Sequence, residues 1–93
     1  MIRRDVIVTN AAGIHARPAA MIVKTTCKFQ SEIIFTKDDV AANAKSIMNL
    51  LLLAAEPGAK IMIEVNGSDE MDAMDAVIKL FEQNFNDDTD QTF

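Results

Sequence analysis

A single histidine, His15, stands where a helix is predicted to begin, in the segment 13–20 with the sequence GIHARPAA. Pro18 is tolerated in the first turn of a helix, and apolar residues recur at helical spacing from Ala16 to Phe29. The N–H groups and the positive dipole end at a helix N-terminus favour a bound phosphate. A lone nucleophilic imidazole at such a place therefore indicates phosphoryl chemistry.

Arg17 supports this interpretation because the donors of a guanidinium match phosphate oxygens. Pro18 has no N–H, which leaves Ala16 and Arg17 as the main-chain donors of the predicted site. The structural alternative is that His15 is only a turn residue beside a helix cap. A His-x-Arg-Pro sequence behind the turn at Gly13 is more specific than a lone histidine.

The remaining pattern predicts four strands and three helices in one domain. Polar residues at Lys37-Asp38-Asp39 predict a turn, and Pro57-Gly58 ends a helix that Ser46 opens. Asp69 is predicted to cap the last helix, which has Met71, Met74, Val77, Ile78 and Phe81 at three- and four-residue steps. The predicted strands are 5–9, 32–36, 40–42 and 60–66, and the first two helices are 16–29 and 46–55.

This order, βαββαβα, predicts an α+β open-faced sandwich, in which three helices cover one face of a four-stranded antiparallel sheet. Residues 1–86 are expected to form the single domain, because residues 87–93 have little to bury and are typical of a disordered acidic tail. A chain of 93 residues buries only a modest core, so an elaborate catalytic cleft is not expected.

Charge is distributed unevenly along the chain. The net charge is −5, but residues 1–60 carry +3 and residues 61–93 carry −8. An acidic chain argues against nucleic acid as a partner. The locally basic front formed by Arg17, Lys24, Lys28 and Lys45 instead suits docking to acidic protein surfaces.

The first apolar run is too short for a signal peptide or a membrane span, and one cysteine allows no internal disulfide. We therefore expect a cytoplasmic protein that does not bind membranes. Neither a cofactor nor a metal site is expected, because a single histidine without a cysteine pair offers no ligand set. Cys27 is expected to be partly exposed and inert.

The chain resembles the HPr family, the histidine-containing phosphocarriers of the bacterial phosphoenolpyruvate phosphotransferase system, because three of its segments stand at the positions where the family has its motifs. The resemblance covers nearly the whole chain and rests on segment 13–20, on Lys45-Ser46-Ile47-Met48 and on Gly67-Ser68-Asp69-Glu70. It implies the same fold and a carrier that is not itself an enzyme. Enzyme I would transfer a phosphoryl group to His15, at Nδ1 in the family, and His15 would pass the group to an EIIA-type domain. Arg17 would stabilise the phosphate, and the carrier is expected to be a monomer.

Ser46 carries a second expectation. Serine is a preferred helix N-cap, and this alone can explain the residue. The resemblance adds a regulatory role, since the matching serine in relatives is phosphorylated by an ATP-dependent HPr kinase/phosphorylase. The added charge is tolerated at a helix N-terminus, so it would repel an acidic partner without refolding the chain.

The resemblance also implies a partner-binding surface. In the family, residues matching Ile47, Met48 and Leu51 join those matching Arg17, Ala20, Met21 and Lys24 in one surface. The helix from Ser46 to Ala55 is too apolar to be buried entirely, so Met48 should be exposed while Leu50 and Leu53 join the core.

Several positions depart from the family pattern. Ala12 replaces a small polar residue and removes a side chain near the site, and Asn49, Leu51 and Ala54 are also unusual. The run from Leu50 to Ala55 and the ending 80–85 are similar to the nitrogen-related branch, in which the carrier regulates and no sugar moves. Lys45-Ser46-Ile47-Met48 favours the sugar or kinase-regulated branch, so the branch stays open.

Two other classes of small protein fit poorly. An acyl carrier protein needs an aspartate before its serine and an all-helical chain, whereas Lys45 precedes Ser46 and strands are evident. A single-sheet RNA-binding module needs a basic sheet face with stacking aromatics, and the chain has no Trp or Tyr.

Overall fold

The computed structural model describes residues 1–10 and 13–85. Its element order, βαββαβα, is the predicted one. The strands are β1 (Ile2–Ile7), β2 (Glu32–Lys37), β3 (Val40–Asn43) and β4 (Lys60–Asn66), and the helices are α1 (Ala16–Thr26), α2 (Ile47–Leu53) and α3 (Glu70–Glu82). The proposed domain boundary at residue 86, the acidic tail 87–93 and Ala12 lie outside the described residues.

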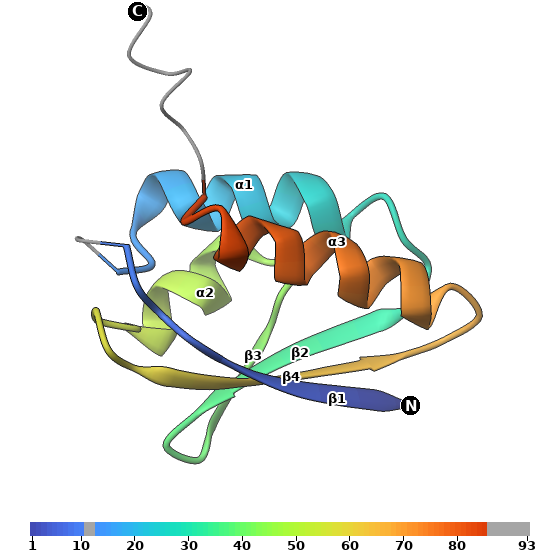
Figure 1. Ribbon diagram of the computed structural model, residues 1–93, viewed down its shortest axis with the longest axis horizontal. Coiled ribbons are helices and arrows are strands. Elements are labelled where there is room, and N and C mark those ends of the chain that lie inside the picture. Colours follow the sequence, from blue (N-terminus) through green and yellow to red (C-terminus); the bar gives the residue numbers. More distant parts are fainter. Residues whose placement is uncertain (11–12, 86–93) are drawn as a thin grey trace, which may run out of the picture.

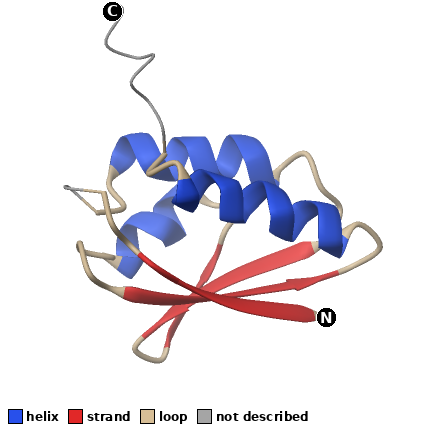
Figure 2. Cartoon of the chain, viewed as in Figure 1, coloured by secondary structure: helices blue, strands red, loops and turns tan. Residues whose placement is uncertain are grey.

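The sheet has the strand order β1-β4-β2-β3, and every neighbouring pair is antiparallel. All three helices cover one face of it and leave the other face open (Figures 1 and 2). Side chains alternate across a strand, so Ile61, Ile63 and Val65 of β4 point into the core while the residues between them face outward. The predicted open-faced sandwich is therefore confirmed.

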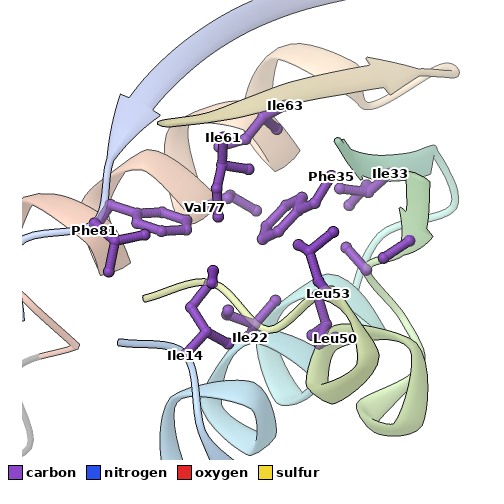
Figure 3. Packing of buried hydrophobic residues seen from close by; sticks show 14 of the residues in the cluster. Ile14, Ile22, Ile33, Phe35, Leu50, Leu53, Ile61, Ile63, Val77 and Phe81 are labelled. Atoms are coloured by element: carbon purple, nitrogen blue, oxygen red, sulfur yellow. The ribbon is translucent and has the colours of Figure 1, made fainter. Parts of the chain in front are cut away.

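The core lies between the sheet and the helices. Phe35 of β2, Ile22 of α1, Leu50 of α2 and Val77 of α3 are fully buried and converge there (Figure 3). Phe81 packs against Phe35, with ring centroids 5.8 Å apart. Each helix is thus fixed to the sheet by its own apolar side chains, which determines where the helix ends lie.

Two of the predicted boundaries near the N-terminus are wrong. β1 runs from Ile2 to Ile7 and not from Asp5 to Thr9, because Ile2 to Ile7 pair with β4 from Val65 back to Lys60. α1 ends at Thr26 and not at Phe29. After Thr26 the backbone N–H groups of Lys28 and Phe29 bond three residues back, which makes a turn.

The ends of the next elements also differ slightly from the prediction. β2 extends one residue further, to Lys37, up to the turn at Asp38 and Asp39, which have φ of 50° and 68°. β3 extends one residue further at its other end, to Asn43, which pairs with Ile34. α2 ends at Leu53 and not at Ala55, because Ala54 adopts the left-handed conformation (φ 54°, ψ 46°). β4 has the predicted bounds.

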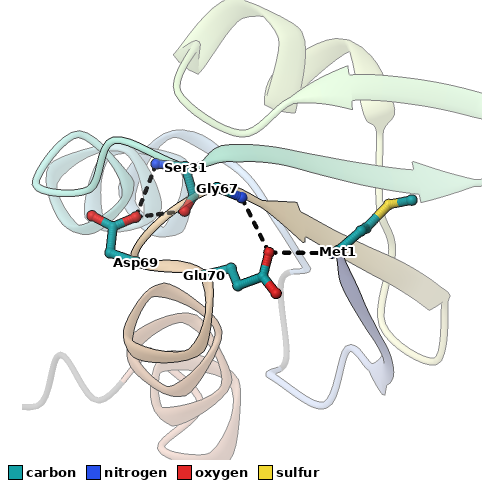
Figure 4. A network of polar contacts seen from close by, with 5 residues as sticks. All are labelled: Met1, Ser31, Gly67, Asp69 and Glu70. Carbon is teal, nitrogen blue, oxygen red and sulfur yellow. Dashed lines mark hydrogen bonds and ion pairs between the residues drawn. The ribbon is translucent and has the colours of Figure 1, made fainter.

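The start of α3 differs from the prediction in its chemistry. Asp69 occupies the N-cap position, but its side chain makes no cap hydrogen bond. Its carboxylate accepts instead from the backbone N–H groups of Gln30 and Ser31 and from the Ser31 hydroxyl, in the loop before β2 (Figure 4). The hydroxyl of Ser31 and then the N–H of Gln30 lower the pKa of Asp69. Asp69 therefore ties α3 to this loop.

Glu70 closes the turn before α3 on the other side. Its Oε1 accepts from the N–H of Gly67 at 3.1 Å and lies 3.3 Å from the N-terminal ammonium of Met1 (Figure 4). The Gly67 N–H and then the N-terminus lower the pKa of Glu70. The inward position predicted for Met71 is wrong, because its side chain is 72% exposed and Ala73 takes the buried position.

Candidate functional site

The loop before α1 holds its shape through contacts with a distant loop. Gly13 has φ +72°, and a Cβ on it would lie 2.3 Å from the carbonyl oxygen of Ala55. The N–H of Ile14 donates to that same oxygen at 2.8 Å. The side chain of Asn10 also bonds this segment, because its Nδ2 donates to the Gly13 carbonyl at 2.7 Å. Glycine is required here, and the backbone leading to His15 is fixed to the loop that follows α2.

His15 is the N-cap residue of α1, as its place before Ala16 predicted. Its backbone is extended (φ −112°, ψ −159°), and its carbonyl accepts the first intrahelical bond, from Ala19 N at 2.9 Å. The side chain is exposed and makes no cap hydrogen bond. The imidazole therefore does not cap the helix, although it belongs to the N-cap residue.

Arg17 is the second residue of α1 and is exposed. Pro18 follows as the third residue, buried against the core, and its ring fits the first turn as the sequence predicted. Ala16 and Arg17 come before Ala19, whose N–H makes the first intrahelical hydrogen bond. The amides of both residues therefore belong to the first turn of α1. An imidazole, a guanidinium and the positive end of a helix dipole thus share one end of α1.

Ser46 is the N-cap of α2, as predicted. Its Oγ accepts from the backbone N–H of Asn49 and from Asn49 Nδ2, both at 3.2 Å. The Asn49 Oδ1 accepts in turn from the N–H of Asn43 at 3.3 Å. The sequence marked Asn49 only as unusual, and the structure shows that its side chain connects the serine to the end of β3.

A model of the family described as PTS HPr component phosphorylation site matches residues 2–83. The chain is 46% identical over 89 residues to the phosphocarrier protein HPr of Xylella fastidiosa, covering 96% of this chain and all of that protein. The chain belongs to the HPr family. It is also 41% identical over 86 residues to the phosphocarrier protein NPr of Proteus mirabilis, covering 91% of this chain and 96% of that one.

A solved structure with the same fold is HPr from Thermoanaerobacter tengcongensis. It superposes with a TM-score of 0.90 at 38% identity and covers 92% of this chain and 97% of that one. The members of this family are phosphocarrier proteins of the phosphotransferase system.

The HPr-family surface named from the sequence lies on α1 and α2. Ala20 and Lys24 are exposed and Met21 is half-buried on α1, and α2 exposes Ile47, Met48 and Leu51. Met48 is 70% exposed, whereas Leu50 and Leu53 are buried, as predicted. Leu52 was not singled out from the sequence, yet it is 76% exposed and enlarges the apolar surface.

The basic residues of this HPr-family chain do not all face solvent alike. Lys24 and Lys28 are exposed, but Lys45 is half-buried and its Nζ donates to the carbonyl of Phe29 at 2.7 Å. Lys45 therefore joins the loop after α1 to the segment just before α2. Cys27 is exposed at the C-cap of α1, in agreement with the prediction. Among the described residues, no helix has the length and apolar composition that crossing a membrane requires.

Nothing in the sequence indicated a contact between Lys37 and the segment that follows α2, which bonds the backbone before His15. Lys37 Nζ donates to the carbonyl of Ala54 at 3.2 Å and lies 3.1 Å from the Glu56 carboxylate. The backbone N–H of Glu56 and then Lys37 lower the pKa of Glu56. A lysine at a strand end beside a polar turn looks like an ordinary surface residue, so no local signal marks this contact.

Proposed function

We propose that His15 is the phosphoryl acceptor of this HPr-family chain, taking the group from phosphorylated Enzyme I and passing it to an EIIA-type domain. The observation that carries this proposal is the exposed imidazole at the N-cap of α1, which makes no cap hydrogen bond. A lone pair on an imidazole nitrogen attacks phosphorus, the bond between phosphorus and Enzyme I breaks, and its electron pair stays with Enzyme I. The second transfer repeats these steps with His15 as the leaving group.

Arg17 has the charge and the place to stabilise the transferred group. It lies two residues after His15 on the first turn of α1, where the helix dipole also favours an anion. Because both transfers must be fast and reversible, this stabilisation has to favour the transition state without trapping the phosphohistidine.

Five exposed residues of α1 and α2 and the half-buried Met21 form the proposed docking surface: Ala20, Met21, Lys24, Ile47, Met48 and Leu51. A flexible methionine among aliphatic side chains, with lysine beside them, suits a weak interface that receives several partners in turn. Acidic partner surfaces would complement Lys24, which increases the rate of encounter.

Ser46 is the proposed regulatory site, to be phosphorylated by an HPr kinase/phosphorylase. Its hydroxyl caps α2 directly before Ile47 and Met48 of the docking surface. A phosphate there would add negative charge where an acidic partner docks and would oppose binding. Treatment with kinase and ATP should add one phosphoryl group to the wild-type protein and none to Ser46→Ala; equal labelling of both would place the modification elsewhere.

A second candidate is a regulatory carrier of the nitrogen branch. The 41% identity to the NPr of Proteus mirabilis favours it, as does the run from Leu50 to Ala55. The 46% identity to HPr of Xylella fastidiosa, and the presence of Lys45 before Ser46, favour the sugar branch. To decide between the branches, EIIA-type domains of both are offered to the phosphorylated protein together. The domain that accepts the phosphoryl group faster identifies the branch.

The deciding experiment is the intact mass of the protein after incubation with cognate Enzyme I, phosphoenolpyruvate and Mg²⁺. We expect one added phosphoryl group that acid removes and base does not. His15→Ala should gain none, while Ser46→Ala should gain as much as the wild type.

Absence of transfer from an Enzyme I that phosphorylates itself would refute the carrier function. Transfer to His15→Ala would refute the assignment of the acceptor. We further propose that the protein is a monomer, which sedimentation equilibrium would test, and that it is cytoplasmic, which cell fractionation would test. We also propose that residues 1–86 form a single domain, which limited proteolysis would test.

A further inference from the structure

Lys37 lies at the end of β2, with its side chain only 16% exposed beneath the C-terminus of α2. Its Nζ is 3.2 Å from the carbonyl oxygen of Ala54 and 3.5 Å from that of Leu53. The last turn of α2 contains no basic residue of its own. Because the final carbonyls of a helix lack intrahelical donors and carry partial negative charge, Lys37 supplies from the sheet the cation that α2 lacks.

The segment that Lys37 contacts is the one that holds the backbone before His15. Residues 54–56 form this loop, which we call the anchor loop. The carbonyl oxygen of Ala55, at its centre, accepts from the N–H of Ile14 at 2.8 Å. Ile14 is buried and is followed directly by His15. Any displacement of the anchor loop is therefore transmitted to His15 through one residue.

The anchor loop needs a restraint from outside. Ala54 has φ 54° and ψ 46°, a conformation that glycine adopts readily and that costs an alanine about 1–2 kcal/mol. Lys37 bonds the carbonyl of this residue and pairs with Glu56 at 3.1 Å, so it contacts both ends of the loop. The Glu56 carboxylate is 65% exposed, so solvent screens the ion pair, and the bonds from the mostly buried Lys37 ammonium to the backbone carbonyls are the stronger part of this restraint.

We propose that Lys37 is a positioning residue for phosphoryl transfer at His15, acting by fixing the anchor loop that bonds Ile14. This inference rests on the proposed function for its catalytic part. Its structural part, that Lys37 maintains the Ile14–Ala55 hydrogen bond, does not depend on the identity of the substrate.

The test compares Lys37→Met with the wild type by amide hydrogen exchange and by single-turnover transfer from phosphorylated Enzyme I. The Ile14 amide should exchange about tenfold faster relative to the amides of β4, as expected for weakening of a charge-assisted contact. The transfer rate constant at saturating Enzyme I should fall about tenfold, while the concentration for half-saturation is unchanged, because the docking surface is untouched.

Lys60→Met is the matched control. Lys60 also lies at one end of a strand, the first residue of β4, and pairs with a carboxylate, Asp5 of β1, at 3.6 Å. Both side chains are mostly exposed, and this pair joins β1 to β4 instead of contacting the anchor loop. We expect no change in Ile14 exchange or in transfer. Lys37→Arg, which keeps the charge and the donors, should restore most of both quantities.

Ile14 exchange in Lys37→Met equal to that of the wild type would overturn the proposal. Faster exchange with an unchanged transfer rate would overturn the positioning role as well. If Lys37→Met is too unstable, the same comparison is made in the Ala54→Gly background, where the backbone cost is relieved. If the wild type accepts no phosphoryl group, the proposed function fails, and Ile14 exchange alone decides whether Lys37 fixes the loop.

Discussion

Replacing Gly13 by alanine probes the contact that fixes the loop before His15. A Cβ at Gly13 would lie 2.3 Å from Ala55 O and 3.0 Å from the Cα of Glu56, and both atoms are backbone. Because no flexible side chain can move aside, either the loop before α1 or the anchor loop must shift. The hydrogen bond from Ile14 N to Ala55 O would then lengthen or break.

Three effects add to the free energy that the Gly13→Ala variant loses. The left-handed backbone, with φ +72°, costs alanine about 1–2 kcal/mol. The forced shift costs about 1–3 kcal/mol, and a weakened hydrogen bond costs about 1 kcal/mol. The reduced entropy of the unfolded chain returns about 0.4–1 kcal/mol. We expect a net loss of about 2–6 kcal/mol in the free energy of unfolding, by these terms taken together.

Gly58→Ala is the matched control because Gly58 has φ +90° but a Cβ on it would have nothing within 4 Å. That variant should lose only the cost of the left-handed backbone, less the entropy gain, which leaves about 0–1.6 kcal/mol. Urea unfolding followed by far-ultraviolet circular dichroism suits a chain with no Trp or Tyr. Losses for the two variants that agree within about 0.5 kcal/mol would refute the role of the Gly13–Ala55 contact.

Three further changes have expected outcomes. Ala54→Gly should raise the free energy of unfolding by about 0.5–1 kcal/mol in urea titrations, because glycine accepts the left-handed backbone of Ala54. Thr26→Val should lose about 1–2 kcal/mol by the same measurement, since the buried Thr26 hydroxyl donates to Ala44 O at 2.8 Å, whereas Thr26→Ser should lose less. Hydrogen bonds from Ser31 and Gln30 lower the pKa of Asp69 in the folded state. The ionised carboxylate therefore stabilises the fold fully above the unfolded pKa, near 4, and this contribution is lost as pH falls through the folded pKa. Stability measured below about pH 4 should therefore fall less steeply in Asp69→Asn than in the wild type.

Local patterns predicted the elements whose neighbours agree with them. The bounds of β4 were correct because Ile61, Ile63 and Val65 alternate strictly between turns at Gly58 and Gly67. The start of α1 was correct because Pro18 fixes φ in the first turn of the helix and Gly13 allows the positive φ of the turn before it. The element order and the open-faced sandwich followed from these signals.

Errors occurred where a tertiary contact decided the outcome. The run up to Ala55 consists of good helix formers, yet α2 stops at Leu53 because its last carbonyls are bonded by Lys37 and the next loop must present Ala55 to Ile14. Helical spacing placed Met71 inward because it fits the same stripe as Met74, but the buried face of α3 is centred on smaller Ala73. Spacing alone does not fix the rotation of a short helix.

The candidate site divides in the same way. His15 and Arg17 were predicted as site residues because an imidazole and a guanidinium occur together at a helix start, and Ser46 was predicted from the resemblance to the HPr family. Ala55, which bonds Ile14, and Lys37, the proposed positioning residue, come from segments far along the chain and have ordinary types. Only the fold brings them together, so the sequence by itself identifies the reactive groups and misses their supports.

Ser46, the proposed regulatory site, and the loop contacted by Lys37 lie at opposite ends of α2. Ser46 caps its start, and the anchor loop follows its end, so seven residues, or about 10 Å of helix, lie between them. That separation exceeds the screening length of about 8 Å at physiological ionic strength. A phosphate on Ser46 would thus act mainly on partners that dock over neighbouring Met48, whereas a change at Lys37 would act on His15 through the backbone. The two proposals therefore place regulation of docking and positioning of the imidazole at opposite ends of α2.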